Sequence, residues 1–342
     1  MQGLGENTQS ETEAGLSYLR NLAAGGDAAA KAALAERLLT RPPYNLEEGV
    51  SCALSGARDG NGDAAHLAAL LTAWGLGIEQ DWPMALDFLT VAAKAGRADD
   101  SRVLAGLAGY WQLARSVAAG ERLTDSQCSA LRDRIRIDEL LRVPRGRYVS
   151  ESPRVGVIER FLAPEMCDWL IGRARPKLEP ARVYDPSSGI YSSAVRTNSE
   201  FHISTFASDL IVMLLQHRIA ALTQLKLAGM EACTILHYAP GEEFKPHADY
   251  FDITKDENAR IVAVDGQRVL TFLVCLNEEF TGGETEFPHL RWRFRGRKGD
   301  ALWFVNIAPD FAPDPRTLHA GLPPRSGEKW MFSQWIRGRR PS

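Results

Sequence analysis

The stretch KPHADYF, residues 245–251, decides how the second half of this sequence is interpreted. It follows ACTILHYA (232–239), whose apolar and β-branched residues predict a β-strand. In an extended segment, residues two apart point to the same side, so His247 and Asp249 can converge on one ion. His319, from a distant strand, would complete the set. Two histidines and a carboxylate leave three positions of an octahedral ion open, which lets non-haem Fe(II) bind a co-substrate and dioxygen together.

The sequence around this stretch predicts helices followed by strands. Two amphipathic helices are predicted over 161–178 and over about 207–227. Further strands, separated by Gly/Pro turns, are predicted over RVLTFLVCLN (268–277), RWRFRG (291–296) and ALWFVN (301–306). Helices followed by an antiparallel sheet indicate an α+β arrangement, with a barrel or jelly roll flanked by helices.

The first half of the chain is rich in Ala and Leu and repeats itself. AAGGDAAAKAAL recurs as DGNGDAAHLAAL, which places Gly26 and Gly62 36 residues apart, and the same interval separates Gly60 from Gly96. This period predicts one helical pair per repeat. The segment GLGIEQDWPMALDFLTVAAKAG (75–96) is similar to the Sel1-like member of the tetratricopeptide class. We therefore expect an α-helical repeat region.

A linking helix is predicted between the two halves. TDSQCSALRDRIRIDELLR (124–142) has an N-cap candidate in Thr124 and is followed by Pro144 and Gly146. The sequence predicts four segments: a disordered tail over 1–12, Sel1-like helical repeats over 13–120, the linking helix over 121–150, and a jelly-roll domain over 151–342.

Composition and charge exclude several classes of protein. The chain has 342 residues, 45% of them hydrophobic, which is enough for two domains with real cores. Its 40 Lys and Arg and 43 Asp and Glu give a formal net charge of −3, so neither nucleic acid nor a membrane is expected as a partner. Five scattered cysteines without a CxxC pattern indicate a reducing compartment. With a polar N-terminus and no apolar run that could span a membrane, the sequence predicts a cytoplasmic protein.

A His-x-Asp pattern is weak evidence by itself, because a chain with seven histidines and many aspartates contains one almost by chance. The residues around His247 and His319 are more informative. Lys329 lies ten residues after His319 and is followed by Trp330 and Trp335. A buried lysine needs an anionic partner, and a dicarboxylate co-substrate would supply one.

Residues 153–338 resemble the catalytic domain of prolyl 4-hydroxylases, in the Fe(II)- and 2-oxoglutarate-dependent dioxygenase superfamily. The matching motifs are FLAPEMCDWLI (161–171), RTN (196–198), YAPG (238–241), PHADYF (246–251), QR (267–268), LN (276–277), GGETEFP (282–288), KGDAL (298–302), HAG (319–321) and GEKW (327–330). The resemblance implies a double-stranded β-helix fold and an enzyme of the EC 1.14.11 class. Such an enzyme hydroxylates a C–H bond while it converts 2-oxoglutarate to succinate and CO2.

The resemblance also implies the cofactors and the residues that hold them. His247, Asp249 and His319 would ligate Fe(II), and Lys329 would bind the distal carboxylate of 2-oxoglutarate. Dioxygen would be the second co-substrate, and a dependence on ascorbate stays open.

Four further residues receive roles from the resemblance. Tyr238 and Thr285 would hydrogen-bond to the same distal carboxylate, while Arg268 and Trp335 would line the substrate groove. The sequence departs from the family at Phe244, where related enzymes often have a tyrosine whose hydroxyl meets the substrate. This departure removes one polar contact and weakens a strictly prolyl interpretation.

Three functions stay open at this point. In the first alternative, the chain hydroxylates a prolyl or other residue in a peptide or protein, and the repeats recruit that target. In the second, it hydroxylates a free amino acid or a small metabolite. The third alternative is an adaptor whose repeats bind a protein partner beside a weakly active oxygenase domain. The intact set of His247, Asp249, His319 and Lys329 favours an enzyme.

Overall fold

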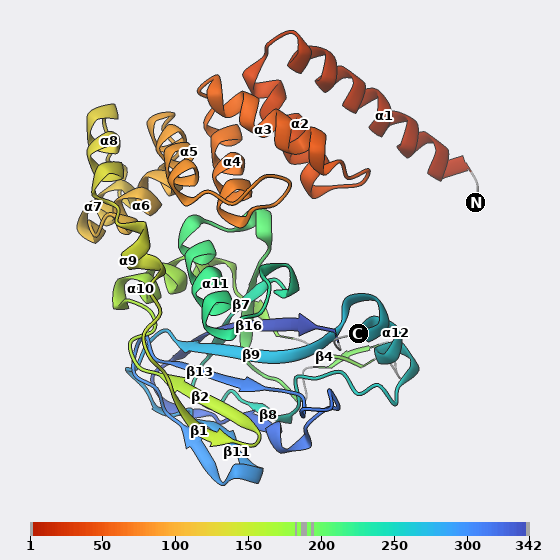
Figure 1. Ribbon diagram of the computed structural model, residues 1–342, viewed down its shortest axis with the longest axis vertical. Coiled ribbons are helices and arrows are strands. Elements are labelled where there is room, and N and C mark those ends of the chain that lie inside the picture. Colours follow the sequence, from red (N-terminus) through yellow and green to blue (C-terminus); the bar gives the residue numbers. More distant parts are fainter. Residues whose placement is uncertain (1–2, 182, 186–189, 193–194, 340–342) are drawn as a thin grey trace. The chain divides into compact units, whose positions relative to one another are not determined.

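The computed structural model describes residues 3–181, 183–185, 190–192 and 195–339. The chain divides into two compact units. The helical unit comprises Met1–Leu141 and Thr205–Leu214, and the sheet unit comprises Arg142–Ser204 and Leu215–Ser342. Figure 1 shows the helices of the first unit and the twisted sheet of the second.

Successive helices of the helical unit pack against each other as pairs. The contacting pairs are α2 with α3, α4 with α5, and α6 with α7. The helices are α1 (Gly3–Ala24), α2 (Ala28–Thr40), α3 (Leu46–Arg58), α4 (Gly62–Trp74), α5 (Trp82–Lys94), α6 (Ala98–Leu107) and α7 (Trp111–Ala118). Helix α1 thus extends into the segment for which the sequence predicts a disordered tail. The paired helices agree with the predicted α-helical repeats.

Left-handed glycines mark the turns between repeats. Gly26, Gly60 and Gly96 have φ angles of 92°, 83° and 87°, and α2, α4 and α6 each begin two residues later. Glycine adopts this conformation without the strain that a Cβ would cause. The interval from Gly60 to Gly96 is the predicted one. The counterpart of Gly26 is Gly60, however, because Gly62 is already the first residue of α4, so the first repeat is two residues shorter than the sequence comparison indicated.

Small and apolar side chains form the core of this unit. Ala64, Ala65, Ala68 and Ala69 of α4 are buried, as their helical spacing predicts. A segment distant in sequence joins the same core, since the 3-10 turn η2 (Thr205–Ala207) places Phe206 against a cluster of buried residues from the repeats.

The predicted linking helix forms as two helices. α8 (Asp125–Arg134) begins at the predicted cap, where Thr124 and Gln127 form a reciprocal capping box. α9 (Ile137–Leu141) follows after a break at Ile135, which takes an extended conformation and buries its side chain. Burial of Ile135 therefore interrupts a segment whose pattern alone predicts one helix.

Antiparallel sheets form the frame of the sheet unit. The large sheet has the order β1-β2-β13-β9-β16-β7-β6-β3, and a smaller one has the order β12-β11-β14-β8. Their strands are β1 (Arg147–Glu151), β2 (Arg154–Ile158), β3 (Glu179–Pro180), β6 (Ser199–Ile203), β7 (Cys233–Tyr238), β8 (Phe244–His247), β9 (Gln267–Cys275), β11 (Thr285–Phe287), β12 (Trp292–Phe294), β13 (Ala301–Val305), β14 (His319–Gly321) and β16 (Lys329–Gly338). Two short pairs complete the unit, β4 (Val183–Asp185) with β5 (Ile190–Ser192), and β10 (Thr281–Gly282) with β15 (Pro324–Ser326).

The core of this unit lies between the large and the small sheet. One cluster of buried residues joins Leu273 of β9 and Met331 of β16 to Phe287 of β11. Side chains alternate along a strand, so Phe272 and Val274 of β9 face the opposite side, and Phe272 packs on Phe161 there. Two sheets that share one apolar core confirm the predicted jelly roll.

Helices flank the large sheet. α10 (Pro164–Ala174) begins with Pro164 in its first turn as predicted, and α11 (Leu210–Thr223) is bound to the sheet through Gln216, whose amide donates to Gln334 of β16 at 2.9 Å. α12 (Asp256–Asp265) forms in the segment between Asp249 and Arg268, where a loop and no helix is expected from the sequence. None of the helices in the described part of the chain is both long and apolar enough to cross a membrane.

Candidate active site

Strand pairing in the small sheet brings two distant histidines together. His247 is the last residue of β8, and His319, the first residue of β14, is its direct partner in the register. Their ring centroids lie 4.3 Å apart. The pairing thus places two imidazoles on one side of a short ladder, as the predicted metal site requires.

Asp249 reaches the two histidines from a bend rather than from a strand. β8 ends at His247, so the extended geometry predicted for the whole His-x-Asp segment stops before Asp249. The carboxylate oxygens lie 3.7 Å from Nε2 of His247 and 3.6 Å from Nε2 of His319. The ligand atoms of these three side chains all lie within 4.8 Å of one another.

Each of the three side chains is oriented by a hydrogen bond from behind. Nδ1 of His247 donates to the Lys245 carbonyl at 2.8 Å, and Nδ1 of His319 donates to the Thr317 carbonyl at 3.1 Å. A carbonyl can only accept, so the proton of each neutral imidazole is on Nδ1 and the lone pair is on Nε2. Both Nε2 atoms therefore face Asp249 as ready metal donors.

The carboxylate is held in the same way. Thr271 of β9 donates its hydroxyl to Asp249 Oδ2 at 2.7 Å, and Asn306 donates its amide to the Thr271 hydroxyl oxygen at 3.0 Å. Both supporting residues are buried. Burial alone would raise the pKa of Asp249, but the neighbouring histidines and the Thr271 bond outweigh this effect and lower it. Burial, with a further contribution from the neighbouring His319, lowers the pKa of His247 to about 3, which keeps this imidazole neutral.

The donor set fits a divalent iron. Two imidazole nitrogens and one carboxylate oxygen on a single face form the 2-His-1-carboxylate arrangement, and their outward Nδ1 atoms are fixed as in known metal sites. No further group of three or more metal-ligating side chains occurs in the described ranges.

One cavity joins this cluster to the residues predicted to hold 2-oxoglutarate. It is lined by His247, Asp249, His319, Tyr238, Thr285, Lys329, Trp335, Arg196, Phe244, Leu236, Leu273, Gly321, Met331 and Ser333. The register of the paired strands brings these residues together. Lys329 of β16 pairs with Tyr238 of β7, and Thr285 of β11 pairs with Gly321 of β14, two residues from His319.

Lys329 is a buried cation that has no carboxylate partner among the described residues. Its side chain is 3% exposed, and no hydrogen bond or ion pair to it occurs within the described part of the chain. Its ammonium lies 5.0 Å from the centre of the Tyr238 ring. Burial lowers the pKa of Lys329 to about 8, and burial likewise raises the pKa of Tyr238 to about 12. The cavity thus holds one unpaired positive charge beside two hydroxyl donors, Tyr238 and Thr285.

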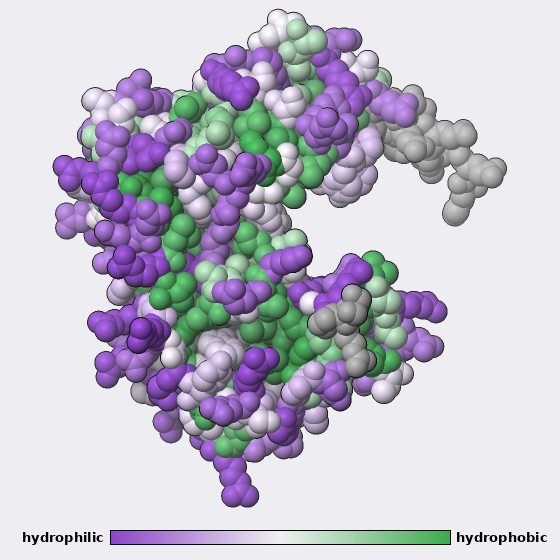
Figure 2. Space-filling view, in the orientation of Figure 1, coloured by the Kyte–Doolittle hydropathy of each residue, from purple (hydrophilic) through white to green (hydrophobic). Residues whose placement is uncertain are grey.

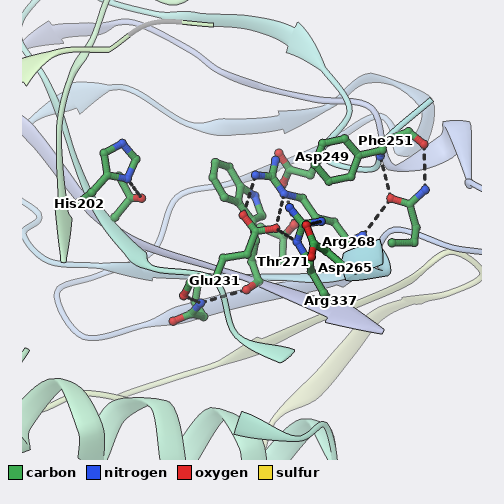
Figure 3. A network of polar contacts seen from close by, with 12 residues as sticks. His202, Glu231, Asp249, Phe251, Asp265, Arg268, Thr271 and Arg337 are labelled. Atoms are coloured by element: carbon green, nitrogen blue, oxygen red, sulfur yellow. Dashed lines mark hydrogen bonds and ion pairs between the residues drawn. The ribbon is translucent and has the colours of Figure 1, made fainter. Parts of the chain in front are cut away.

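Arg268 has a different environment from the one predicted. Its guanidinium binds both carboxylate oxygens of Glu231 at 2.8 Å and does not line the cavity, whereas Trp335 does. Arg268 lies over the Trp335 ring at 3.8 Å. Figure 3 shows Arg268 and Arg337 converging on Glu231, and Arg337 also binds it at 2.7 Å. Arg268 therefore contacts the cavity through Trp335.

Phe244, the departure from the family pattern, contacts both a cation and a metal-site histidine. Its ring stacks on His247 with centroids 3.4 Å apart and planes at 11°. The Arg196 guanidinium lies 4.7 Å from the centre of the same ring and is held by Glu200 at 2.6 Å and by Asn198 at 3.0 Å. The phenyl ring thus fixes the plane of His247.

Several residues that support the site were not predicted from the sequence. Thr271 is a single hydroxyl in an otherwise apolar strand, and this polar residue at a buried position was a usable signal. Asn306 and Glu231 gave no comparable signal, because their partners depend on the register of distant strands.

Comparisons with known proteins bear on the same region. The family described as the 2OG-Fe(II) oxygenase superfamily matches residues 233–337. Prolyl 4-hydroxylase 1 of Arabidopsis thaliana is 34% identical over 221 residues, which are 60% of this chain and 76% of that protein.

Two solved structures are also similar. The viral collagen prolyl hydroxylase of Paramecium bursaria Chlorella virus 1, in its 2OG complex, is 28% identical, covering 56% of this chain and 99% of that one with a TM-score of 0.44. A Sel1 repeat protein from Oxalobacter formigenes is 24% identical, covering 33% of this chain and 88% of that one with a TM-score of 0.27.

The Arabidopsis relative is matched over most of its own length, and the matched oxygenase region contains the His-Asp-His cluster. This chain therefore belongs to the prolyl 4-hydroxylase family of the 2OG-Fe(II) oxygenase superfamily, a family of dioxygenases that use Fe(II), 2-oxoglutarate and O2.

Proposed function

We propose that this chain hydroxylates a prolyl residue within a peptide or protein. The observation that carries the proposal is the single cavity in which the His247, Asp249 and His319 cluster and the unpaired Lys329 lie together. The prolyl assignment draws further support from the relative named prolyl 4-hydroxylase 1, at 34% identity.

We assign His247, Asp249 and His319 as the iron ligands. The iron would supply the redox chemistry that couples dioxygen to the oxidation of 2-oxoglutarate. The chain's own part is to hold three donors in a fixed orientation. The carbonyls behind the two histidines and Thr271 behind Asp249 fulfil that part, because each fixes one ligand in place before an ion arrives.

We assign Lys329, Tyr238 and Thr285 to the distal carboxylate of 2-oxoglutarate. A buried ammonium without a partner is costly, and a carboxylate of the co-substrate would compensate it. Tyr238 keeps its proton at neutral pH because its pKa is raised to about 12, so its hydroxyl donates to that carboxylate. The apolar walls from Leu236, Leu273 and others exclude water from this charge pair.

We assign Trp335 to the substrate side of the cavity and Arg268 to its positioning. Trp335 lines the cavity, and its buried Nε1 atom has no hydrogen-bond partner among the described residues. Arg268 supports the indole face, and Glu231 holds Arg268.

Substrate specificity is tested by measuring succinate formation and product mass together. We expect proline-containing peptides to stimulate succinate release and to gain one oxygen atom, whereas free L-proline does neither. Stimulation by free proline alone would shift the function to the small-metabolite alternative. That alternative has one observation in its favour, since Phe244 offers no hydroxyl to a peptide substrate.

Replacement of Thr271 by valine is expected to weaken metal binding by about 10- to 100-fold, the usual cost of losing a hydrogen-bond partner of a metal ligand. Valine has the same shape but cannot donate to Asp249 Oδ2. Co(II) affinity, measured anaerobically by competition with a chelator, provides the readout. Thr271→Ser keeps the hydroxyl and should retain most of the affinity. Equal affinities for the valine variant and the wild type would remove Thr271 from the site.

The affinity for 2-oxoglutarate is expected to fall as pH rises above about 8. The pKa of Lys329 is lowered to about 8, so the ammonium that binds the carboxylate is fully present below that pH. Above it the free protein loses the charge, and the affinity falls by up to tenfold per pH unit until the pKa of the complex is reached. Titration calorimetry from pH 6.5 to 10 checks this. A Lys329→Arg variant, whose charge persists, should show a flat profile, and a flat wild-type profile would contradict the assignment.

Three finer assignments complete the proposal. The helical repeats would hold the protein that carries the target residue, the chain would act in the cytoplasm, and ascorbate would restore iron that has become oxidised without substrate. Deletion of residues 1–120 should then raise the KM for a protein substrate more than the KM for a short peptide.

A further inference from the structure

The sheet unit contains a second, larger pocket that the active site does not use. It has a volume of about 540 Å³. Along β13, Leu302 and Phe304 point into the core between the sheets, so Trp303 and Val305 face the opposite side, where this pocket lies. Figure 2 shows green hydrophobic residues beside the strands labelled β9 and β13 in Figure 1. The pocket lies where α11 ends at Thr223 and no longer covers the sheet.

The floor of the pocket is apolar and built in a specific way. The Trp303 indole lies against Gly156 of β2, where a Cβ would come within 2.5 Å of the ring. Tyr148 of β1 stands edge-on to Trp303, with centroids 5.5 Å apart. Leu225 and Phe311 add apolar walls, and both are half-buried. Because residue 156 is a glycine, the Trp303 indole can lie directly against β2, which leaves the pocket above it open.

The charge around this floor has one sign. Three arginines, Arg147, Arg154 and Arg339, line the pocket, and no acidic residue does. Arg339 donates to the Val264 carbonyl. Arg154 lies on the same face of β2 as Gly156, is exposed, and its side chain has no ion pair or hydrogen bond within the described residues. Arg147 pairs with Val157 of the core face, so its side chain points to the other side of the sheet. An uncompensated guanidinium next to an apolar pocket complements a ligand with an apolar body and a negative end.

We propose that this pocket binds a single-chain amphipathic carboxylate, such as a fatty acid, with its chain over Trp303 and its carboxylate at Arg154. The volume lies in the ordinary range of small-molecule sites, about 300–1,000 Å³. A polyanionic metabolite would leave the apolar floor uncovered, and a cationic amphiphile would meet the like charges of Arg154 and Arg339. The site is separate from the iron cavity and does not depend on the proposed hydroxylation.

Calorimetric titration of the full-length protein with sodium decanoate, below its micelle concentration, tests the proposal. We expect saturable binding with one site, at least tenfold tighter than that of decylamine. Arg154→Glu should lose at least tenfold in decanoate affinity, whereas Arg147→Glu, on the opposite face of the sheet, should keep it. Thr223→Trp, which fills the pocket from the end of α11, should lose affinity without removing a charge. Equal binding of decanoate and decylamine, or unchanged affinity in Arg154→Glu and Thr223→Trp, would overturn the proposal.

Two controls separate this site from other binders of carboxylates. Decanoate could enter the iron cavity through Lys329, so the titration is repeated with Lys329→Met. Affinity that persists in Lys329→Met and is lost in Arg154→Glu supports the pocket, and the reverse pattern refutes it. An acidic, apolar peptide that binds while decanoate does not would also refute the fatty-acid assignment and make this face a protein-docking surface. None of these readouts depends on iron or 2-oxoglutarate, so failure here leaves the proposed function untouched.

Discussion

Asp249→Ala protein is expected to lose more than about a hundredfold in metal affinity and to show no detectable succinate release with any peptide. Loss of a residue that merely supports a ligand costs about 10- to 100-fold, so loss of the ligand itself should exceed that range. Asp249 is the only carboxylate of the cluster, and its removal leaves only the two imidazoles. Anaerobic addition of Fe(II) and 2-oxoglutarate should produce the weak visible charge-transfer band of their chelate in wild-type protein and none in the variant.

A matched control is available three residues away. Asp252 is exposed, and within the described residues its carboxylate accepts hydrogen bonds only from Thr254 in its own loop, so Asp252→Ala should keep the band and the metal affinity. Loss of the band in both variants would point to damage of the loop after β8 rather than of a ligand. A normal band in Asp249→Ala would remove Asp249 from the ligand set.

Lys329→Met is expected to have two opposite effects. The affinity for 2-oxoglutarate should fall at least about 30-fold, because truncating one partner of a buried charge pair costs about 2–5 kcal/mol. The ligand-free protein should become more stable, because a lysine whose pKa is lowered from 10.5 to about 8 opposes folding below pH 8 by on the order of 3 kcal/mol. Methionine fills similar space without a charge. Thermal unfolding with and without 2-oxoglutarate measures both effects.

The combination of these effects distinguishes a binding residue from a structural one. Wild-type protein should be stabilised by 2-oxoglutarate in the presence of metal, whereas Lys329→Met should start higher and gain nothing. Lys255→Met, at an exposed position, should resemble the wild type in both respects. A variant that is destabilised and still responds to 2-oxoglutarate would show that Lys329 supports the fold and does not bind the co-substrate.

Much of the sheet unit was predictable because its signals are local. β7, β12 and β13 lie within segments whose β-branched and aromatic residues predict strands, and β9 begins one residue before its predicted segment. The small helical residues of α4 are buried for an equally local reason, since close helix packing needs them. Patterns of this kind depend on neighbours within a few residues.

Other features depended on pairing between distant strands and escaped prediction. The sequence implied a substrate contact for Arg268, but the register of β9 against β16 places it beside Arg337, with Glu231 between them. The support of Asp249 by Thr271 arises because a bend after β8 turns the carboxylate towards β9. Residue types alone do not reveal which strands will be neighbours.

The pairing of His247 with His319 has a mechanical consequence. The two histidines belong to strands of four and three residues, which are short for an independent sheet. An ion held by both would fasten together chain segments that are about 70 residues apart, as a clip that closes a long loop does. Such an ion would stabilise the folded chain by mass action, about 2.7 kcal/mol at a hundred times its dissociation constant. The metal that performs the reaction would therefore also stabilise the small sheet. Its removal by a chelator would destabilise the fold and stop turnover at the same time.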